Sequence, residues 1–371
     1  GIFVVEADGV AIENMTARNY TSNGFYWTGV EGYRGSYLTA YRNGDYGVYA
    51  FDSVQGQFDN SLGSGSPDAG FYIGECYPCD AVIDNVISEY NGLGYSGTNS
   101  GGELYIVNST FRNNRAGIVP NSGSYELCYP NRQTTVVGNP VYENNETDNP
   151  AIDVALLAQG NGILLAGAVQ NVVEKNRVWD HDRTGIGLVP FPEEDANDLA
   201  PDTADWDVPC EETHDDEVPP IAEEDCKAVE GLLEGCVVIW NPYDNRVVGN
   251  VVEGSLVADI AVGTADLLGT GETTDTLRNC FSGNTFGTTA PTDLEALATG
   301  NGGDWNAGAL DLIGLLGTPA DAPPKDAYKT TPEPGDQPNM PDAATAPAAP
   351  AKDMTPDVDI EAITVPDKPT S

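Results

Sequence analysis

The chain repeats a short pattern about every 23 residues, and this period limits the fold more than any other feature. The clearest copies lie within residues 24–84, where Gly-Phe-Tyr-Trp, Gly-Val-Tyr-Ala and Gly-Phe-Tyr-Ile begin at Gly24, Gly47 and Gly70. Further copies begin at Gly1, Gly94, Gly117, Gly162, Gly185 and Ala258. A period of this length marks stacked supersecondary units, each of which contacts mainly its neighbours.

Each unit also has a second apolar segment, often with an Asn, and a polar corner. Residues 106–111 and 247–252 are examples of the segment, and Arg42-Asn43-Gly44 is an example of the corner. The apolar residues alternate with period 2, which excludes ankyrin and TPR helices. Asn and Gly tolerate the left-handed backbone of tight corners, and stacked Asn side chains can bond from coil to coil. Because parallel crossovers favour a right-handed path, the sequence predicts an all-β, right-handed parallel β-helix.

Composition divides the chain into five parts. Residues 1–190 and 236–287 carry the coils, and residues 191–235 form an acidic insertion with a short helix expected at 221–233. A shorter loop insertion covers residues 121–134. Residues 288–317 predict a small C-terminal helical cap over the open end of the coil. Residues 318–371 are rich in Pro, Ala, Asp and Thr, which predicts a disordered tail or a linker to a further module.

The charge balance excludes two classes of partner. The chain has 58 acidic and 16 basic residues and a formal net charge of −42. Nucleic acid and anionic membrane surfaces are bound through Lys and Arg, so we expect neither as a partner. No run is long and apolar enough to cross a bilayer, so we expect no membrane insertion.

Cysteine usage indicates an oxidising compartment. The seven cysteines are Cys76, Cys79, Cys128, Cys210, Cys226, Cys236 and Cys280. With only two His in the chain, disulfides fit better than a zinc site, so we expect an extracellular, secreted or cell-surface protein. Cys210 with Cys226 and Cys236 with Cys280 are two expected pairs, whereas either Cys76 or Cys79 pairs with Cys128, or the two pair with each other. Gly1 already begins a repeat, so we expect residues upstream of it.

Repeats such as Gly162-Ile163-Leu164-Leu165 and Asn245-Arg246-Val247-Val248-Gly249-Asn250 resemble those of the pectin-lyase-like superfamily. The resemblance covers residues 1–286 without the acidic insertion. It implies a right-handed parallel β-helix and a class that includes polysaccharide lyases, hydrolases and epimerases, phage tailspikes and adhesins. The motifs of polygalacturonases and alginate epimerases are absent from this sequence. Val178-Trp179-Asp180-His181 lacks the Ile of the pectate lyases' Trp-Ile-Asp-His, and we expect His181 to be solvated.

Four carboxylates form two pairs, each at equivalent positions of successive units in the most regular part of the repeat. Asp45 stacks on Asp68, and Asp52 on Glu75, at the strand spacing of about 4.8 Å. When two carboxylates lie this close, either the pKa of one of them is raised, as a catalytic acid and base require, or the two hold a cation. Ca²⁺ is the candidate cation at Asp45 and Asp68. Alternatively, an Asp ahead of a coil start caps its own backbone.

An aromatic ladder runs beside them. Tyr26, Tyr49 and Tyr72 follow Gly by two residues, a position that points outward, and Phe3 precedes them in the same register. The ladder with Trp27 is a candidate platform for sugar rings, or it serves stability alone. Arg42 is a candidate for binding a uronate carboxylate, or it pairs with local acids.

Two functions fit these features. The first is a secreted β-helix protein that binds or processes an extracellular, acidic polysaccharide or cell-surface glycan, as a lyase, hydrolase or epimerase if catalytic, with Ca²⁺ as a candidate cofactor. The second is a non-catalytic cell-surface, adhesion or structural module. Missing family motifs favour the second, and the clustered Tyr, Trp and acidic residues favour the first.

Overall fold

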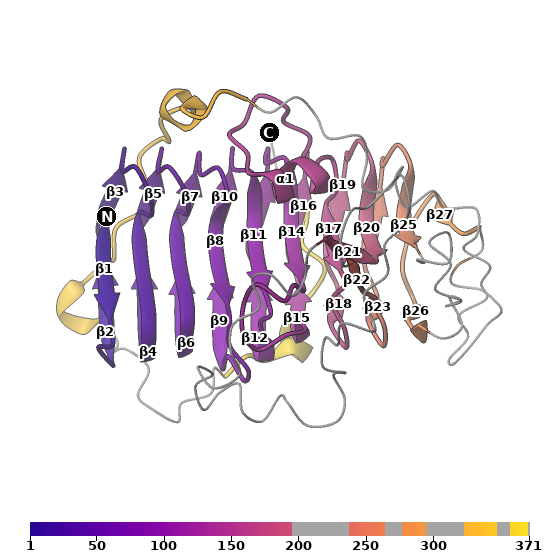
Figure 1. Ribbon diagram of the computed structural model, residues 1–371, viewed down its shortest axis with the longest axis horizontal. Coiled ribbons are helices and arrows are strands. Elements are labelled where there is room, and N and C mark those ends of the chain that lie inside the picture. Colours follow the sequence, from indigo (N-terminus) through magenta and orange to yellow (C-terminus); the bar gives the residue numbers. More distant parts are fainter. Residues whose placement is uncertain (195–236, 264–276, 293, 295–322, 347–356, 370–371) are drawn as a thin grey trace.

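The protein is a right-handed parallel β-helix in the computed structural model, which describes residues 1–194, 237–263, 277–292, 294, 323–346 and 357–369. The strands stack along one long axis (Figure 1). They form two sheets of 17 and 8 strands, with every pairing in both sheets parallel. The predicted fold class is therefore confirmed.

The larger sheet forms two walls, which meet in the long strands β4 and β6. The first wall consists of β1 (Ile2–Val5), β4 (Phe25–Ser36), β6 (Val48–Asp59), β8 (Ala69–Gly74), β11 (Leu93–Thr98), β14 (Ala116–Asn121), β17 (Ile163–Ala166), β20 (Thr184–Val189), β25 (Ala258–Val262) and β27 (Thr289–Ala290). The second wall adds β2 (Val10–Glu13), β9 (Ala81–Asp84), β12 (Gly101–Val107), β15 (Arg132–Val137), β18 (Val172–Glu174), β23 (Arg246–Val248) and β26 (Cys280–Ser282).

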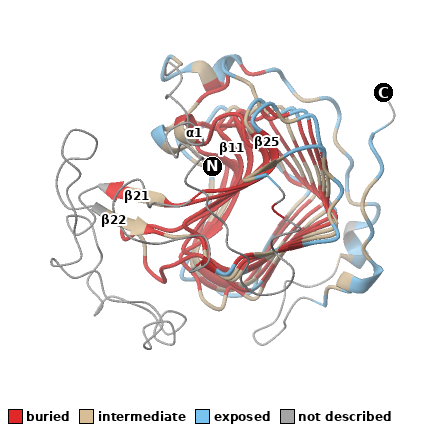
Figure 2. Cartoon of the chain, turned by 90° about the vertical axis from the view of Figure 1, so that its right-hand side faces the viewer, coloured by how far each residue is buried: buried red, intermediate tan, exposed pale blue. Residues whose placement is uncertain are grey.

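The smaller sheet is the third wall. It consists of β3 (Thr16–Arg18), β5 (Thr39–Tyr41), β7 (Leu62–Ser64), β10 (Ile87–Glu89), β13 (Thr110–Arg112), β16 (Pro140–Tyr142), β19 (Arg177–Trp179) and β24 (Val251–Glu253). One continuous apolar core runs inside the three walls, and its largest side chains include Trp27, Tyr33 and Phe58. Figure 2 shows this buried interior end on.

The predicted register holds along the first wall. Phe25 pairs with Val48 and Val48 with Phe71. The predicted late copy joins the same wall one residue out of the expected register, because Ala258 pairs with Thr184 rather than with Gly185. Buried asparagines form the expected ladders at the corners. In one ladder the backbone N–H of Asn139 donates to Asn176 Oδ1 at 3.0 Å, and that of Asn176 donates to Asn250 Oδ1 at 2.9 Å. These ladders satisfy backbone groups that the corners would otherwise bury unpaired.

Three insertions lie against the outside of the first wall. A loop of residues 122–131 follows β14, and α1 (Asp153–Ala158) packs Ala155 and Ala158 on the outer alanines of the wall. The sequence predicted the loop but not the helix. Residues 191–194, which open the predicted acidic insertion, form β21 (Phe191–Glu194), which pairs antiparallel with β22 (Val237–Trp240). The rest of the insertion, including the expected helix at 221–233, lies outside the described residues, as does most of the expected C-terminal cap.

The predicted disordered tail instead packs along the coil where it is described. It contains three short 3₁₀ turns, η5 (Ala327–Thr330), η6 (Ala343–Thr345) and η7 (Ile360–Ala362). Its apolar residues Val358, Ile360 and Ile363 pack on an outer valine row of the second wall, which consists of Val82, Val107 and Val137. Figure 2 shows the C-terminal end of the tail on the side of the coil opposite β21 and β22. Composition favoured disorder, but a few apolar residues suffice to dock this segment.

The described cysteines settle part of the disulfide pattern. Cys76 bonds to Cys79, so neither pairs with Cys128, which is itself disulfide-bonded. Cys280 is a free thiol, so the expected Cys236–Cys280 pair is wrong. Cys210, Cys226 and Cys236 lie outside the described residues.

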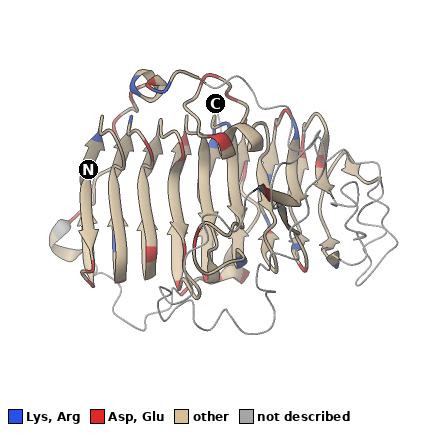
Figure 3. Ribbon diagram, in the orientation of Figure 1, with Lys and Arg blue, Asp and Glu red and all other residues tan. Residues whose placement is uncertain are grey.

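Charged residues are sparse on the broad faces of the described strands and gather near strand ends and in connecting segments (Figure 3). Among the described residues, no helix has the length and apolarity needed to cross a bilayer.

Removing one rung of the asparagine ladder tests its role in stability. Asn176→Ala removes the acceptor of the Asn139 backbone N–H, one of the acceptors of the Asn139 amide, and the side-chain donor to the Val136 carbonyl. We expect the free energy of unfolding to fall by about 3 kcal/mol in urea denaturation. Asn284→Ala, at the partly exposed end of the same ladder, is the control. Equal losses in the two variants would contradict a ladder stabilised by burial.

Candidate functional site

The aromatic ladder predicted from the repeat exists on the outer side of the first wall. Phe3, Tyr26, Tyr49 and Tyr72 occupy one register on successive strands. Their successive ring centroids lie 4.3, 4.5 and 4.8 Å apart. Tyr49 also stacks on Tyr46, with ring centroids 4.1 Å apart and planes within 2°. Tyr49 therefore has parallel neighbours in Tyr26 and Tyr46, so the ladder presents ring edges and hydroxyl groups rather than free ring faces.

Exposure of the ladder falls steeply along the coil axis. Phe3 is 62% exposed, Tyr26 and Tyr49 are half-buried, and Tyr72 is 0% exposed. The loop of residues 122–131 causes this burial, because the Tyr72 hydroxyl donates to Glu126 Oε2 at 2.5 Å. The predicted platform is therefore open at Phe3 and sealed at Tyr72.

Two predicted binding residues lie elsewhere. Trp27 is fully buried in the core, where its Nε1 donates to the Val10 carbonyl at 3.3 Å, so it does not belong to an outer platform. Period-2 alternation explains this, because Trp27 follows the outward Tyr26 by one residue. Arg42 Nε donates to the Thr331 carbonyl of the tail at 2.7 Å and stacks over Tyr41. Arg42 is thus engaged by the tail rather than by the ladder.

Asp45 and Asp68 lie one coil apart, as the register predicted, and the Asp68 N–H donates to the Asp45 carbonyl at 3.3 Å. Asp68 is 7% exposed, and burial raises the pKa of its carboxyl to about 7 despite a hydrogen bond with Tyr46. The nearby charge of Asp45 raises the pKa of Asp68 further. Burial also raises the pKa of Asp45, which remains partly exposed.

Glu126 adds a second carboxyl with a raised pKa. Loss of hydration raises the pKa of Glu126 well above its ordinary value, and the charges of Glu75 and Asp68 act in the same direction. Burial likewise raises the pKa values of the Tyr46 and Tyr72 hydroxyls, which stay protonated. We call Tyr46, Tyr49, Tyr72, Asp68 and Glu126 the Tyr–acid cluster. Carboxyls with a pKa near neutrality are suited to proton transfer.

The other predicted carboxylate pair is divided by the loop. Asp52 and Glu75 occupy equivalent corners with φ of 46° and 53°. Asp52 remains partly exposed, whereas Glu75 is buried and its Oε1 accepts from the Leu127 N–H at 2.8 Å. Glu75 therefore anchors the loop. No group of three or more His, Cys, Asp or Glu in the described residues is arranged to hold a metal, so Ca²⁺ at Asp45 and Asp68 stays a prediction.

Side chains from distant elements hold the covering loop in place. The Glu193 carboxylate of β21 accepts from the Ser124 hydroxyl at 2.8 Å and from Trp240 Nε1 at 2.7 Å. Asn99 donates to the Gly123 carbonyl at 2.6 Å and accepts from the Gly123 N–H at 3.1 Å. The cover over Tyr72 is thus a built part of the fold, connected to both the coil and the β21–β22 pair.

The sequence did not single out Tyr46, Glu126 or Glu193. Tyr46 lies between Asp45 and the repeat start Gly47, so a systematic reading of the residue before each Gly could have found it. Glu126 and Glu193 belong to inserted segments, whose return to the first wall no periodicity indicates. The expectation that His181 is solvated is wrong. His181 is 1% exposed and continues an asparagine ladder through a 3.2 Å contact with Asn144 Nδ2, and burial lowers its pKa to about 3.

No protein-family model and no curated protein matches this chain. Similar solved structures include the A-module of the mannuronan C-5 epimerase AlgE4 from Azotobacter vinelandii, with 13% identity, a TM-score of 0.49, and coverage of 76% of this chain and 71% of that one. The periplasmic alginate epimerase AlgG has 14% identity and a TM-score of 0.41, over 74% of this chain and 50% of that one. DFA-IIIase from Arthrobacter chlorophenolicus A6 has 14% identity and a TM-score of 0.34, over 74% of this chain and 54% of that one. This chain therefore spans about half the length of the latter two, and no functional assignment follows from identities and TM-scores this low.

The raised pKa of Asp68 predicts a pH dependence of stability. Below the ordinary aspartate pKa of about 4, the carboxyl is protonated in both the folded and the unfolded chain. Between about pH 4 and pH 7 only the folded chain keeps the proton, so Asp68 lowers the free energy of unfolding as pH rises. Asp68→Asn removes this cost, and we expect it to stabilise the protein by up to about 4 kcal/mol near pH 8 and hardly at all near pH 4.

Urea denaturation of both proteins across this pH range measures the effect. Asp153→Asn, which removes an exposed carboxylate at the start of α1, controls for the loss of one negative charge. A stability difference for Asp68→Asn that does not change with pH would contradict a proton held by burial.

Proposed function

We propose that this protein binds an extracellular polysaccharide along the outer side of its first coils, and that the Tyr–acid cluster supplies a proton to the bound glycan. The observation that carries the proposal is the ladder itself, which is open at Phe3 and ends at carboxyls with raised pKa values. Half-exposed ring edges and hydroxyls of Tyr26 and Tyr49 match the mixed apolar and polar surface of a sugar chain. The disulfide bonds at Cys76–Cys79 and Cys128 support a secreted or cell-surface location.

The raised pKa values of Asp68 and Glu126 support an acidic glycan as the ligand, because a protonated carboxyl does not repel an anion. A chain with a net charge of −42 repels polyanions in general. Near the ladder, however, burial raises the pKa of Glu126 well above its ordinary value and that of Asp68 to about 7, so both carboxyls hold a proton more readily than exposed acids do. This part of the surface therefore carries less negative charge than its composition suggests.

Proton delivery would run from the buried acid through a tyrosine. Tyr46 is hydrogen-bonded to Asp68 and stacks on Tyr49, so it connects the acid with the aromatic ladder. In the proposed step, the Tyr46 hydroxyl donates its proton to the substrate and takes the Asp68 proton in return. Elimination, hydrolysis and epimerisation all include a proton donor, so the cluster is compatible with a lyase, a hydrolase or an epimerase.

A non-catalytic adhesion or structural module is the second candidate. It is favoured by the loop of residues 122–131, which seals Tyr72 and Glu75 away from any ligand on the outer face. In that case the ladder contributes binding and stability, and the protons on Asp68 and Glu126 only accompany their burial.

Binding is tested with a panel of neutral and uronate polysaccharides, with and without Ca²⁺. Phe3→Ala combined with Tyr49→Ala should weaken binding of the retained glycan at least tenfold, or about 1.4 kcal/mol, because it removes the open part of the ladder. Tyr20→Ala, which removes an exposed tyrosine outside the ladder, should leave affinity unchanged. Unchanged affinity in the double variant would rule out the ladder as the binding surface.

Catalysis is tested on the same glycans by release of reducing ends, formation of unsaturated uronate, and deuterium incorporation at C5 from heavy water. Asp68→Asn and Glu126→Gln keep the shape of the cluster but remove its exchangeable carboxyl protons. We expect at least a hundredfold loss of turnover with affinity retained in Asp68→Asn, the range for removing a general acid, and a smaller loss in Glu126→Gln, whose carboxyl lies outside the Tyr46–Asp68 route. If the wild-type protein binds a glycan but produces no change in any of the three assays, the adhesion module is the correct assignment.

A further inference from the structure

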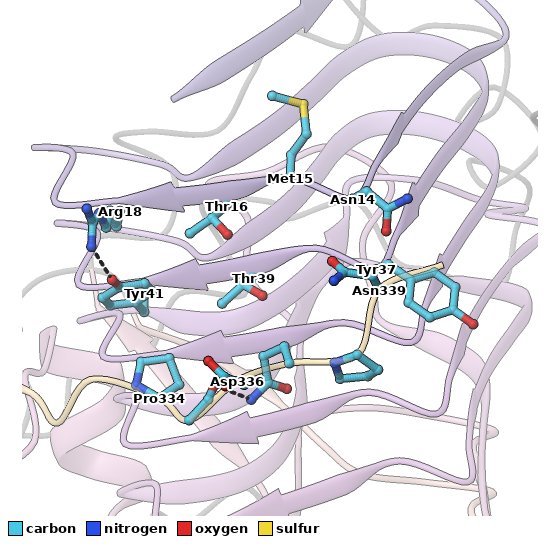
Figure 4. Close-up of a pocket in the computed structure, with 13 residues that line it drawn as sticks. Asn14, Met15, Thr16, Arg18, Tyr37, Thr39, Tyr41, Pro334, Asp336 and Asn339 are labelled. Carbon is cyan, nitrogen blue, oxygen red and sulfur yellow. Dashed lines mark hydrogen bonds between the residues drawn. The ribbon is translucent and has the colours of Figure 1, made fainter. Parts of the chain in front are cut away.

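A cavity of about 430 Å³ lies between the C-terminal tail and the first two coils, away from the Tyr–acid cluster. Its floor is the outer face of the third wall at β3 and β5 with the corners before them, and its roof is tail residues 334–339 (Figure 4). The volume is within the range of small-ligand sites. Chain segments about 300 residues apart in sequence therefore line one space.

The roof is fixed at both ends. At one end Arg42 Nε donates to the Thr331 carbonyl at 2.7 Å, and at the other the Met340 N–H donates to Asn14 Oδ1 at 2.7 Å. Between these contacts Pro334 and Pro338 restrict the backbone, because each ring fixes one dihedral angle. A roof held in this way gives a preformed cavity, which lowers the ordering cost of binding.

The lining is polar and suited to a sugar. Thr16 and Thr39 supply hydroxyls from adjacent strands, and Gln337 and Asn339 supply amides from the roof. Asp336 is the roof carboxylate and can accept hydrogen bonds from sugar hydroxyls.

Arg18 gives the cavity its preference for a carboxylate. Its guanidinium donates to the Tyr41 hydroxyl at 2.8 Å and lies 3.6 Å from the Glu333 carboxylate. Arg18 and Tyr41 therefore already bind a carboxylate of the tail, Glu333, whose Oε1 accepts from the Tyr41 hydroxyl at 2.9 Å. A ligand carboxylate can make the same contacts. The side chains of Arg18 and Glu333 are 57% and 59% exposed, so the ion pair between them is weak and a ligand carboxylate can replace Glu333.

We propose that this cavity binds a short hexuronate oligosaccharide, with its carboxylate on Arg18 and Tyr41 and its hydroxyls on the amides and Asp336. The site lies on the third wall, whereas the ladder lies on the first. It therefore provides a second glycan contact that does not depend on the Tyr–acid cluster. The tail, which sequence composition predicted to be disordered, forms the roof of the site.

The test is isothermal titration calorimetry of the full chain with hexuronate disaccharides, namely digalacturonate, dimannuronate and diglucuronate, each beside its neutral counterpart. Arg18→Gln should weaken hexuronate binding at least tenfold, because it removes the charge-assisted bond. Asn14→Gly should also weaken hexuronate binding, because it removes the side chain that holds the roof at Met340. The substitution adds no backbone strain, since Gly adopts the φ of 51° at this position freely. Arg278→Gln and Asn85→Gly are matched controls, the latter at an equivalent exposed corner with a φ of 54°.

Hexuronate binding that is lost in Arg18→Gln and Asn14→Gly, kept in both controls and kept in the Phe3/Tyr49 double variant establishes the site. The last variant separates the two proposals, because it should abolish only binding along the ladder. The cavity proposal is overturned if no hexuronate binds, if the neutral disaccharides bind equally well, or if Arg18→Gln binds like the wild-type protein.

Discussion

The backbone hydrogen bonds between successive coils are the interaction on which the rest of this structure depends. They hold equivalent residues one strand spacing apart, about 4.8 Å, and they do so for every side chain of the unit at once. As a consequence, residues of the same type lie beside each other on adjacent coils. Asparagines such as Asn176 and Asn250 gain hydrogen bonds from this arrangement. Asp45 and Asp68 also occupy adjacent coils, and burial of Asp68, assisted by the charge of Asp45, raises the pKa of its carboxyl to about 7.

The loop of residues 122–131 and the C-terminal tail fold back onto the coil and determine which of its outer residues remain in contact with water. The loop of residues 122–131 withdraws Tyr72 from solvent and brings Glu126 beside it, and loss of hydration then raises the carboxyl pKa values. On another wall the tail covers β3 and β5 but leaves a polar cavity beneath it. The same cylinder of parallel strands therefore presents two different chemical surfaces, because two different segments cover it.

The sequence was sufficient to predict the features that repeat. The positions of the coil starts, the alternation of inward and outward residues, the asparagine ladders and the Phe3–Tyr72 ladder all follow from the 23-residue period. Strict use of that alternation would also have placed Trp27 in the core.

Exposure could not be predicted in the same way, because it depends on where the insertions fold. Nothing local to Tyr72 indicates that Glu126 will cover it, and nothing local to Arg42 indicates a bond to Thr331. The tail was predicted to be disordered from its Pro and Asp content, but Ile360 and Ile363 dock it on a row of valines. His181 was expected in solvent because acidic residues flank it, yet its position in the unit places it in a buried ladder.

The account depends most on the claim that covering the outer face leaves protonated carboxyls beside the aromatic ladder. Carboxyl-carbon NMR titration of the full chain, assigned with Asp68→Asn and Glu126→Gln, measures those protons directly. The account predicts that the Asp68 resonance titrates near pH 7 and that Glu126 keeps its proton well above the ordinary glutamate range. Titration of both resonances near pH 4, as in exposed carboxylates, would contradict it.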